Sequence, residues 1–328
     1  MASGSSITRS AGTSSLTVSG TSTLANSVST SGTQTYTGAV TLGADATLAT
    51  ANSNVIFGNT VNGAASLTVS AGSGDVTFSA AVGASTELTG MDVSAANISL
   101  KNVTTGIGAA QTYTATNGIA TNSTYRSEGG AITFDGNLTI NDRLVVDTTN
   151  SGNDAAGAHI IFNGTINSQA SEANTIALTA GSAGVVTLGA SVGLAANGAV
   201  GSLTVHSGEA RLGGDVKATG VQRYAGGTTL TTSVNLSGSG LSLAAVDLGG
   251  NTLTATEAGT GTISGVVSGT GALTKAGSGT LTLSSTNTYS GDTTVNAGTL
   301  KLTGALNTDT DVVLNGTGVW DLQAAQTV

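Results

Sequence analysis

The 328-residue sequence contains no cysteine and no proline, and only 3% of its residues are aromatic and 8% charged. Without cysteine, the chain can form neither a disulfide framework nor a thiolate metal site. Without proline or a strict three-residue glycine period, it cannot form a collagen triple helix. Since 38% of the residues are hydrophobic while charge is scarce, the composition also argues against charge-driven disorder.

The charge balance and the lack of long apolar runs restrict the possible partners. The net charge of −9 provides no basic surface for a phosphate backbone, so we expect no nucleic-acid partner. Long uncharged runs such as Ala173–Gly208 are broken throughout by Gly, Ser, Thr and Asn. No segment therefore holds the roughly 20 apolar residues of a membrane span, and we expect no membrane insertion by this segment.

What the sequence has in abundance is short stretches in which apolar and polar residues alternate. Examples are SLTVS (66–70), AITFDGNLTI (131–140) and TLTLSS (280–285), in which apolar residues two apart would share one face of a β-strand. Most stretches end at Gly, Asn or Asp, which tolerate the left-handed backbone of tight turns. Because Gly, Ser, Thr, Asn and Val are weak helix formers and no amphipathic helical stretch intervenes, the sequence predicts an all-β fold.

A short motif recurs along the chain and indicates a repeating architecture. Gln or Asn, one further residue and Tyr come together at Tyr36, Tyr113, Tyr224 and Tyr289, at intervals of 77, 111 and 65 residues. These intervals are near-multiples of about 18–22 residues, the length of one three-strand solenoid coil. We therefore predict a parallel β-solenoid with these tyrosines at coil corners and a narrow interior that has little room for aromatic clusters. A sandwich or a barrel is the alternative, although it would require two or more domains.

Two stretches resemble known families. The first, Gly269–Leu302, reads GTGALTKAGSGTLTLSSTNTYSGDTTVNAGTLKL and resembles the passenger-associated transport repeat of bacterial autotransporters. Its first half matches the form G-x-L-x-K-x-G-x-G-T-L-x-L at Leu273, Lys275, Gly277, Gly279, Thr280, Leu281 and Leu283. Its second half matches N-T-Y-x-G-x-T-x-V-x-x-G-T-L at Asn287, Thr288, Tyr289, Gly291, Thr293, Val295, Gly298, Thr299 and Leu300. The second stretch, SGTQTYTGAVTLGADATL (31–48), is similar to repeats of very large filamentous-haemagglutinin-like adhesins.

The resemblance implies a single-stranded right-handed parallel β-helix that is exported across a bacterial outer membrane and is secreted or displayed on the cell surface. It implies no catalytic residues. We divide the chain into a leader foreign to the natural protein (1–6), degenerate solenoid coils (7–262), coils of the transport repeat (263–302) and further, truncated coils (303–328). Because strand patterning still runs at the final LQAAQTV, we expect the chain to be a piece of a longer protein.

A polysaccharide-degrading enzyme is the sharpest functional alternative, since several β-helix families are lyases or hydrolases. Such a site needs carboxylates gathered a few ångströms apart. The most charged turn-like region, 141–159, is predicted to be a binding loop with the candidate residues Asp142, Arg143, Asp147, Asp154 and His159. Other candidates are Glu209 with Arg211, and Asp309 with Asp311. We expect the carboxylates to be solvated turn residues and the chain not to be an enzyme.

No cofactor or metal site is predicted. The calcium-binding nonapeptide and EF-hand spacing are absent, so Ca²⁺ would bind only opportunistically. Its ligands would then be Asp309 with Asp311, or Asn150 with Asn153 and Asp154. His159 and His206 lie in different repeats and are expected to be outward strand residues instead of metal ligands.

We therefore interpret the chain as a structural and adhesive shaft segment of a secreted bacterial surface protein. Exposed Thr, Ser and Asn rows and longer loops would supply many weak contacts to an unidentified host-surface, matrix or glycan ligand. A third alternative, an ice- or mineral-binding surface, is suggested by T-x-T runs, but these are scattered where a working ladder needs a fixed offset. Because open coil edges invite strand pairing, end-to-end self-association is a further expectation.

Overall fold

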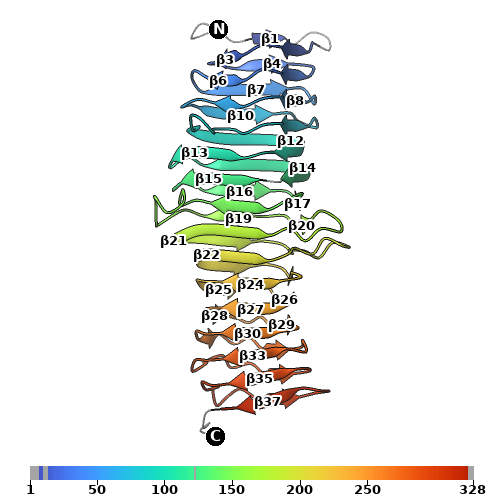
Figure 1. Ribbon diagram of the computed structural model, residues 1–328, viewed down its shortest axis with the longest axis vertical. Coiled ribbons are helices and arrows are strands. Elements are labelled where there is room, and N and C mark those ends of the chain that lie inside the picture. The colour runs from blue at the N-terminus through green and yellow to red at the C-terminus, as the bar shows by residue number, and fades with distance from the viewer. Residues whose placement is uncertain (1–6, 10–13, 122, 324–328) are drawn as a thin grey trace. The chain divides into compact units, whose positions relative to one another are not determined.

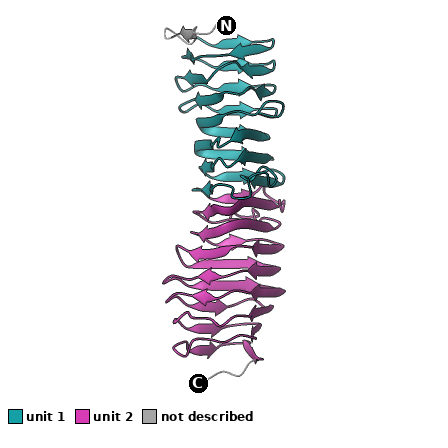
Figure 2. Cartoon of the chain, turned by 90° about the vertical axis from the view of Figure 1, so that its left-hand side faces the viewer, with its two compact units in different colours: residues 1–164 teal, residues 165–328 magenta. Residues whose placement is uncertain are grey.

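The computed structural model describes residues 7–9, 14–121 and 123–323, and the predicted leader, residues 1–6, lies outside these ranges. The chain divides into two compact units, Met1–Gly164 and Thr165–Val328 (Figure 2). Within the described ranges every helix-or-strand element is a β-strand, and every pairing between these strands is parallel. None of the described residues forms a helix with the length and apolar character that crossing a membrane would require. The predicted all-β, parallel solenoid fold is confirmed.

Unit 1 is built from three stacks of parallel strands, each coil contributing one strand to each stack (Figure 1). The first stack contains β1 (Ile7–Arg9), β4 (Val28–Thr30), β7 (Ala46–Thr50), β10 (Ser66–Ser70), β12 (Gly90–Leu100), β14 (Gln111–Thr121), β16 (Ile132–Asp135) and β19 (Ile160–Phe162). The second contains β2 (Leu16–Val18), β5 (Gln34–Tyr36), β8 (Val55–Phe57), β11 (Val76–Phe78), the distal halves of β12 and β14, and β17 (Leu138–Ile140). The third contains β3 (Ser22–Leu24), β6 (Val40–Leu42), β9 (Val61–Asn62), β13 (Val103–Ile107), β15 (Thr124–Glu128) and β18 (Leu144–Asp147).

Unit 2 repeats this three-stack plan. One stack contains β21 (Ile176–Leu188), β22 (Leu203–Leu212), β24 (Val221–Tyr224), β27 (Gly240–Leu243), β30 (Thr260–Ile263), β33 (Thr280–Leu283), β35 (Thr299–Leu302) and β37 (Val319–Leu322). The next contains the distal halves of β21 and β22, then β25 (Gly227–Leu230), β28 (Val246–Asp247) and β31 (Val267–Ser268). The last contains β20 (Ile166–Ser168), β23 (Val216–Lys217), β26 (Val234–Gly238), β29 (Leu253–Glu257), β32 (Leu273–Lys275), β34 (Thr293–Val295) and β36 (Val312–Leu314).

The strand register gives the length of each coil. In unit 1, Tyr113 pairs with Phe134, 21 positions later, and in unit 2 Leu281 pairs with Leu300, 19 positions later. Most coils in both units have such lengths, within the predicted range. Longer coils occur where a loop is inserted, as between Phe134 and Phe162, 28 positions apart.

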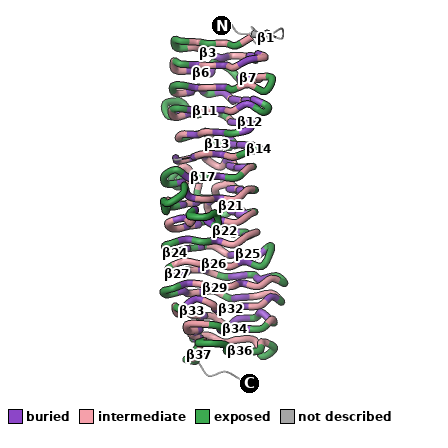
Figure 3. Tube along the Cα trace, turned by 90° about the vertical axis from the view of Figure 1, so that its right-hand side faces the viewer, coloured by how far each residue is buried: buried purple, intermediate pink, exposed green. Residues whose placement is uncertain are grey.

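Alternation along each strand separates the interior of the coil from its surface (Figure 3). In β10, Leu67 and Val69 are fully buried, whereas Thr68 between them lies at the outer face. Parallel in-register stacking places the same inward position of successive coils in one row, so Leu67 and Val69 continue into Met91 and Val93 of β12. Each coil buries its inner face against its neighbours, which a single coil could not do.

Aromatic side chains stack inside unit 1, and the expectation that a narrow interior would exclude them was wrong. Tyr36, Phe57 and Phe78 lie in one row, with ring centroids 5.3 and 4.7 Å apart and nearly parallel planes. Phe134 stacks between Tyr113 and Phe162 at 5.2 and 5.0 Å. The strand spacing of about 4.8 Å is close to the distance at which flat rings stack, so register alone aligns them.

The Gln-x-Tyr motif forms a buried cluster of hydrogen bonds at a coil corner, which we call the corner bracket. The Gln34 side-chain amide donates to the carbonyl oxygens of Val28 (3.1 Å) and Ala49 (2.8 Å), which belong to successive coils. Its own oxygen accepts a hydrogen bond from the Tyr36 hydroxyl at 3.1 Å. Gln222 makes the corresponding three bonds in unit 2. The Tyr residues are therefore interior corner residues, as the repeats suggested.

Turn residues hold neighbouring coils together and explain the abundance of Gly and Asn. The side-chain oxygen of Asn54 accepts from the Asp75 backbone N–H (2.9 Å), and Asp75 in turn accepts from the Asn97 N–H (3.2 Å). At other turns backbones touch: a Cβ on Gly279 would lie 1.8 Å from the carbonyl oxygen of Gly259 in the preceding coil. Only glycine fits such an approach.

Candidate functional site

The predicted binding region contains a well-defined loop of unit 1. Residues 148–159 connect β18 to β19 and supply the additional length of the 28-residue coil (Figure 1). The buried Thr148 hydroxyl closes the base of this loop, donating to the Ala158 carbonyl (2.8 Å) and accepting from the Ala158 N–H (3.0 Å). Asn150 and Ser151 adopt left-handed backbone conformations, with φ of 49° and 61°. The loop thus has a fixed base and a tightly turned tip.

Asp147 holds the start of this loop. Its Oδ1 accepts hydrogen bonds from the N–H (2.9 Å) and the hydroxyl (2.6 Å) of Thr149, and its Oδ2 accepts from the Ser151 N–H (2.9 Å). The side chain is buried. A carboxylate that accepts three hydrogen bonds from its own loop stabilises a turn. The structure therefore gives Asp147 the role of a turn residue, but a buried one, not a solvated one.

The other candidate residues of this region lie at the surface. Asp142 accepts from the backbone N–H of Arg143 (2.7 Å), and Asp154 accepts from that of Ala156 (3.1 Å). Arg143 and His159 are exposed. In the part of the chain that the structure describes, no hydrogen bond joins Asp142, Asp147 and Asp154 to one another.

Titratable residues elsewhere are also dispersed. Over the described ranges, no group of three or more His, Asp or Glu side chains is arranged to hold a metal ion. Asp309 and Asp311 are both exposed, and His206 is an outward residue of β22.

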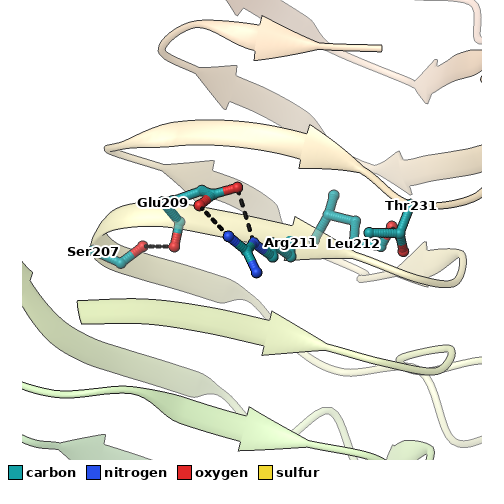
Figure 4. A network of polar contacts seen from close by, with 5 residues as sticks. All are labelled: Ser207, Glu209, Arg211, Leu212 and Thr231. Atoms are coloured by element: carbon teal, nitrogen blue, oxygen red, sulfur yellow. Dashed lines mark hydrogen bonds and ion pairs between the residues drawn. The ribbon is translucent and has the colours of Figure 1, made fainter. Parts of the chain in front are cut away.

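Glu209 and Arg211 form a pair of their own on the outer face of β22 (Figure 4). Arg211 Nε donates to Glu209 Oε1 and its terminal Nη2 donates to Oε2, each at 3.0 Å. The hydrogen bonds from Arg211 lower the pKa of the Glu209 carboxyl, and those to Glu209 raise the pKa of the Arg211 guanidinium. A carboxylate neutralised in this way is poorly suited to act as an acid or a base.

The transport-repeat resemblance falls on an unusual interior feature of unit 2. Lys275, at the end of β32, is fully buried, and its Nζ lies 3.2 Å from Oε1 of Glu257 at the end of β29, which is 1% exposed. The ammonium also donates to the carbonyl oxygen of Gly277. Neither carboxylate oxygen of Glu257 accepts a hydrogen bond of good geometry, so the attraction to Lys275 is what compensates for its burial.

The sequence singled out Lys275 but missed its partner. Glu257 ends the strand LTATE, in which Leu253 and Ala255 face inward, and the two-residue period places Glu257 on the same side. The sequence signal that could have revealed Glu257 is a charged residue at an inward position of the strand pattern.

The second half of the repeat forms another corner. Asn287 accepts from the Val267 N–H of the preceding coil (3.0 Å) and donates to the Ala305 carbonyl of the following coil (3.0 Å). Tyr289 is buried beside it, and its hydroxyl lies 2.5 Å from the Thr293 hydroxyl. Burial raises the pKa of the Tyr289 hydroxyl to about 12. These repeat residues thus connect three successive coils.

Comparison with known families identifies this segment. Residues 273–302, which span β32 to β35, match the family model of the passenger-associated transport repeat. Neither the curated proteins nor the solved structures contain a match to the chain. The repeat and the β-solenoid architecture fit a segment of an autotransporter passenger, and the repeat implies a secreted or surface-exposed protein.

Proposed function

We propose that this chain is a structural and adhesive segment of a secreted bacterial surface protein, exported as part of an autotransporter passenger or giant adhesin. The observation that carries the proposal is the transport repeat at residues 273–302, set within coils of the same solenoid type as the rest of unit 2. A stack of coils braced by backbone ladders and side-chain brackets suits a display scaffold, because its outer face can vary without changing the core.

Adhesion would arise from the surface that the coils present. The outward positions carry mainly Thr, Ser and Asn, which offer hydrogen-bond donors and acceptors but little apolar area. The loop 148–159 adds a feature with a fixed base and ends at the exposed His159, and Arg143, which precedes β18, is also exposed. We assign Asp142, Arg143, Asp154 and His159 to a contact surface for a host-surface, matrix or glycan ligand, with Asp147 as the residue that holds its shape.

We further propose that the segment has no catalytic role and requires no cofactor. Three observations support this over a polysaccharide-degrading enzyme. The candidate carboxylates accept hydrogen bonds from the backbone of their own loops, Glu209 is paired with Arg211, and among the described residues no hydrogen bond joins Asp142, Asp147 and Asp154. A glycosidase would need two carboxyl groups facing each other across a cleft.

Self-association is the remaining proposed interaction. Leu314 of β36 and Val319 and Leu322 of β37 are each about half exposed, at 51, 52 and 48%. Strands with exposed apolar side chains favour pairing with a further coil, whether from a neighbouring segment or a second copy. Light scattering over a range of concentrations tests this, and a strictly monomeric species at high concentration would contradict it.

The adhesive function is tested by binding of the whole chain to an array of glycans and immobilised matrix proteins. The matched comparison is a variant carrying Arg143→Gln and Asp154→Asn, which alters the loop surface but leaves Asp147 and Thr148 in place. We expect specific binding that this variant weakens. Absence of binding to every surface, or hydrolysis of an arrayed polysaccharide, would refute the proposal.

A further inference from the structure

Two loops of unit 2 line an open hollow that the sequence did not reveal. The loops, 169–175 and 193–199, project from the same side of the unit, and their residues line a hollow of about 440 Å³ together with Lys217 and Thr219. Backbone and side-chain bonds join the loop 193–199 to β20: Ser168 N–H donates to Gly198 O (2.9 Å) and Ala195 N–H donates to Asn167 Oδ1 (3.0 Å).

Two residues in the walls of this hollow have an unusual backbone conformation and are hydrogen-bonded to each other. Ser171 and Asn197 both adopt left-handed conformations, with φ of 68° and 57°, although neither is glycine. The Ser171 N–H donates to the Asn197 carbonyl at 3.1 Å, so the two strained residues hold each other in place. Strained backbone that the surrounding structure maintains is characteristic of binding sites. The hollow is therefore preformed, which lowers the entropic cost of binding.

The lining offers both signs of charge and several uncharged polar groups. The Glu172 carboxylate accepts from the Asn174 amide through Oε2 (2.8 Å), which orients it. The Lys217 ammonium and the Asn197 side-chain amide are exposed, and neither has a partner among the described residues. The Thr219 hydroxyl donates to the carbonyl oxygens of Val200 (3.5 Å) and Gly201 (3.4 Å) in the preceding coil.

We propose that this hollow is a subsite for a neutral oligosaccharide. The inference rests on the adhesive function proposed above and assigns it a ligand class. Sugar hydroxyls donate and accept at once, and so they match a site that combines an ammonium, a carboxylate and an amide. The volume lies within the range of small-ligand sites. With one carboxylate (Glu172) and one ammonium (Lys217), the lining has no net charge and gives no net electrostatic attraction to an anionic sugar or a cationic ligand, which leaves an uncharged sugar as the best match.

The absence of an aromatic platform from this lining sets the strength of binding. Affinity comes from hydrogen bonds exposed to water, so a single site binds weakly, and a surface carrying many copies gains through multivalency.

The test uses the whole chain and an array of neutral oligosaccharides ending in galactose, N-acetylglucosamine or mannose, beside their sialylated and sulfated counterparts. Titration of the best neutral oligosaccharide, followed by NMR, then compares variants. Lys217→Met removes the ammonium, and Asn197→Gly removes the amide while retaining the left-handed backbone. Lys301→Met, on the outer face of β35, and Asp92→Asn, on the outer face of β12, are the controls. Circular dichroism melting verifies that each variant is folded.

We expect Lys217→Met to weaken binding about tenfold or more and Asn197→Gly about threefold to tenfold, with both controls unchanged. Neutral-sugar binding that is insensitive to Lys217→Met and Asn197→Gly would overturn the site, and binding of anionic sugars alone would overturn the ligand class. Binding to matrix proteins but to no glycan would overturn the inference and leave the adhesive function standing. This holds whether or not Lys217→Met weakens the binding to matrix proteins. Binding to neither surface would refute both.

Discussion

The two units share one architecture but fill it with different side chains. Unit 1 contains all four phenylalanines of the chain and three of its five tyrosines, and all of these rings except Tyr125, which packs edge to face, stack in rows. Unit 2 contains no phenylalanine, and its rows are mainly aliphatic, as with Leu281 and Leu300, although it also buries Tyr224, Tyr289 and the pair of Lys275 and Glu257. The strands of both units pair in parallel register and form the same kind of coil. The comparison shows that different sets of inward side chains can fill this coil when they repeat from one coil to the next.

The corner bracket, in contrast, is common to both. Gln34 and Gln222 make equivalent bonds to carbonyls of two successive coils and to a tyrosine two residues later. Corners depend on backbone geometry, which is the same in both units, so they use the same motif. The following predictions test which differences between the units affect stability.

The buried ion pair gives the largest expected effect and is confined to unit 2. Lys275→Met leaves Glu257 as an unpaired buried charge, which should lower the free energy of unfolding by about 3–5 kcal/mol. Denaturant unfolding followed by the fluorescence of Trp320, the single tryptophan of the chain, measures this in unit 2.

A double variant separates charge from packing at the same place. Replacing both Lys275 and Glu257 by Met should recover most of the lost stability, because apolar side chains of similar size substitute for a buried pair. The control, Lys301→Met at the surface, should change the stability by less than about 0.5 kcal/mol. If the double variant were as unstable as Lys275→Met, the ion pair would not be the cause.

The aromatic stack of unit 1 should give the next largest effect. Phe134→Leu removes ring contacts with Tyr113, Tyr125 and Phe162 and should cost about 2–3 kcal/mol, since each pair contributes roughly 0.5–1.5 kcal/mol. Near-ultraviolet circular dichroism of the tyrosines reports the loss. Leu281→Met in unit 2 is the matched control and should leave that signal unchanged. A loss no larger than that of the control would mean that stacking adds nothing beyond burial.

The corner bracket should show no difference between the units. Gln34→Leu and Gln222→Leu each remove two hydrogen bonds to backbone carbonyls and one from a buried tyrosine hydroxyl, and each should cost about 1–3 kcal/mol. Thermal unfolding of the two variants measures the costs side by side. Unequal losses, differing by more than about 1 kcal/mol, would show that the corners are not equivalent.

The smallest effect concerns the exposed pair of Glu209 and Arg211. Since Arg211 lowers the pKa of Glu209 in the folded state, the pair stabilises the fold above the ordinary glutamate pKa of 4.5, and this contribution is lost as the pH falls through the lowered value. Arg211→Ala should move the pKa of Glu209 up towards 4.5. A carboxyl NMR titration measures the shift, and an unchanged pKa would contradict the assigned cause.

The sequence alone predicted much of the fold, because strand alternation and coil length are local properties. The sequence also carries a signal for the row of Tyr36, Phe57 and Phe78, since each of these residues is 21 positions from the next. The tyrosine motif alone does not reveal this row, because it leaves out the phenylalanines. The burial of Asp147 could not be predicted from the sequence, because it depends on how the loop 148–159 turns back over this side chain. The hollow beside Lys217 could not be predicted either, since it requires two loops from different coils to meet.

Hydrogen exchange of the whole chain, with and without the best-binding glycan or matrix protein from the array, tests the central claim that a solenoid scaffold presents adhesive loops. The account predicts slow exchange in the strands throughout, and new protection on binding confined to the loops 148–159, 169–175 and 193–199. Protection spread along the outer faces of the short coils, or none in these loops, would contradict it.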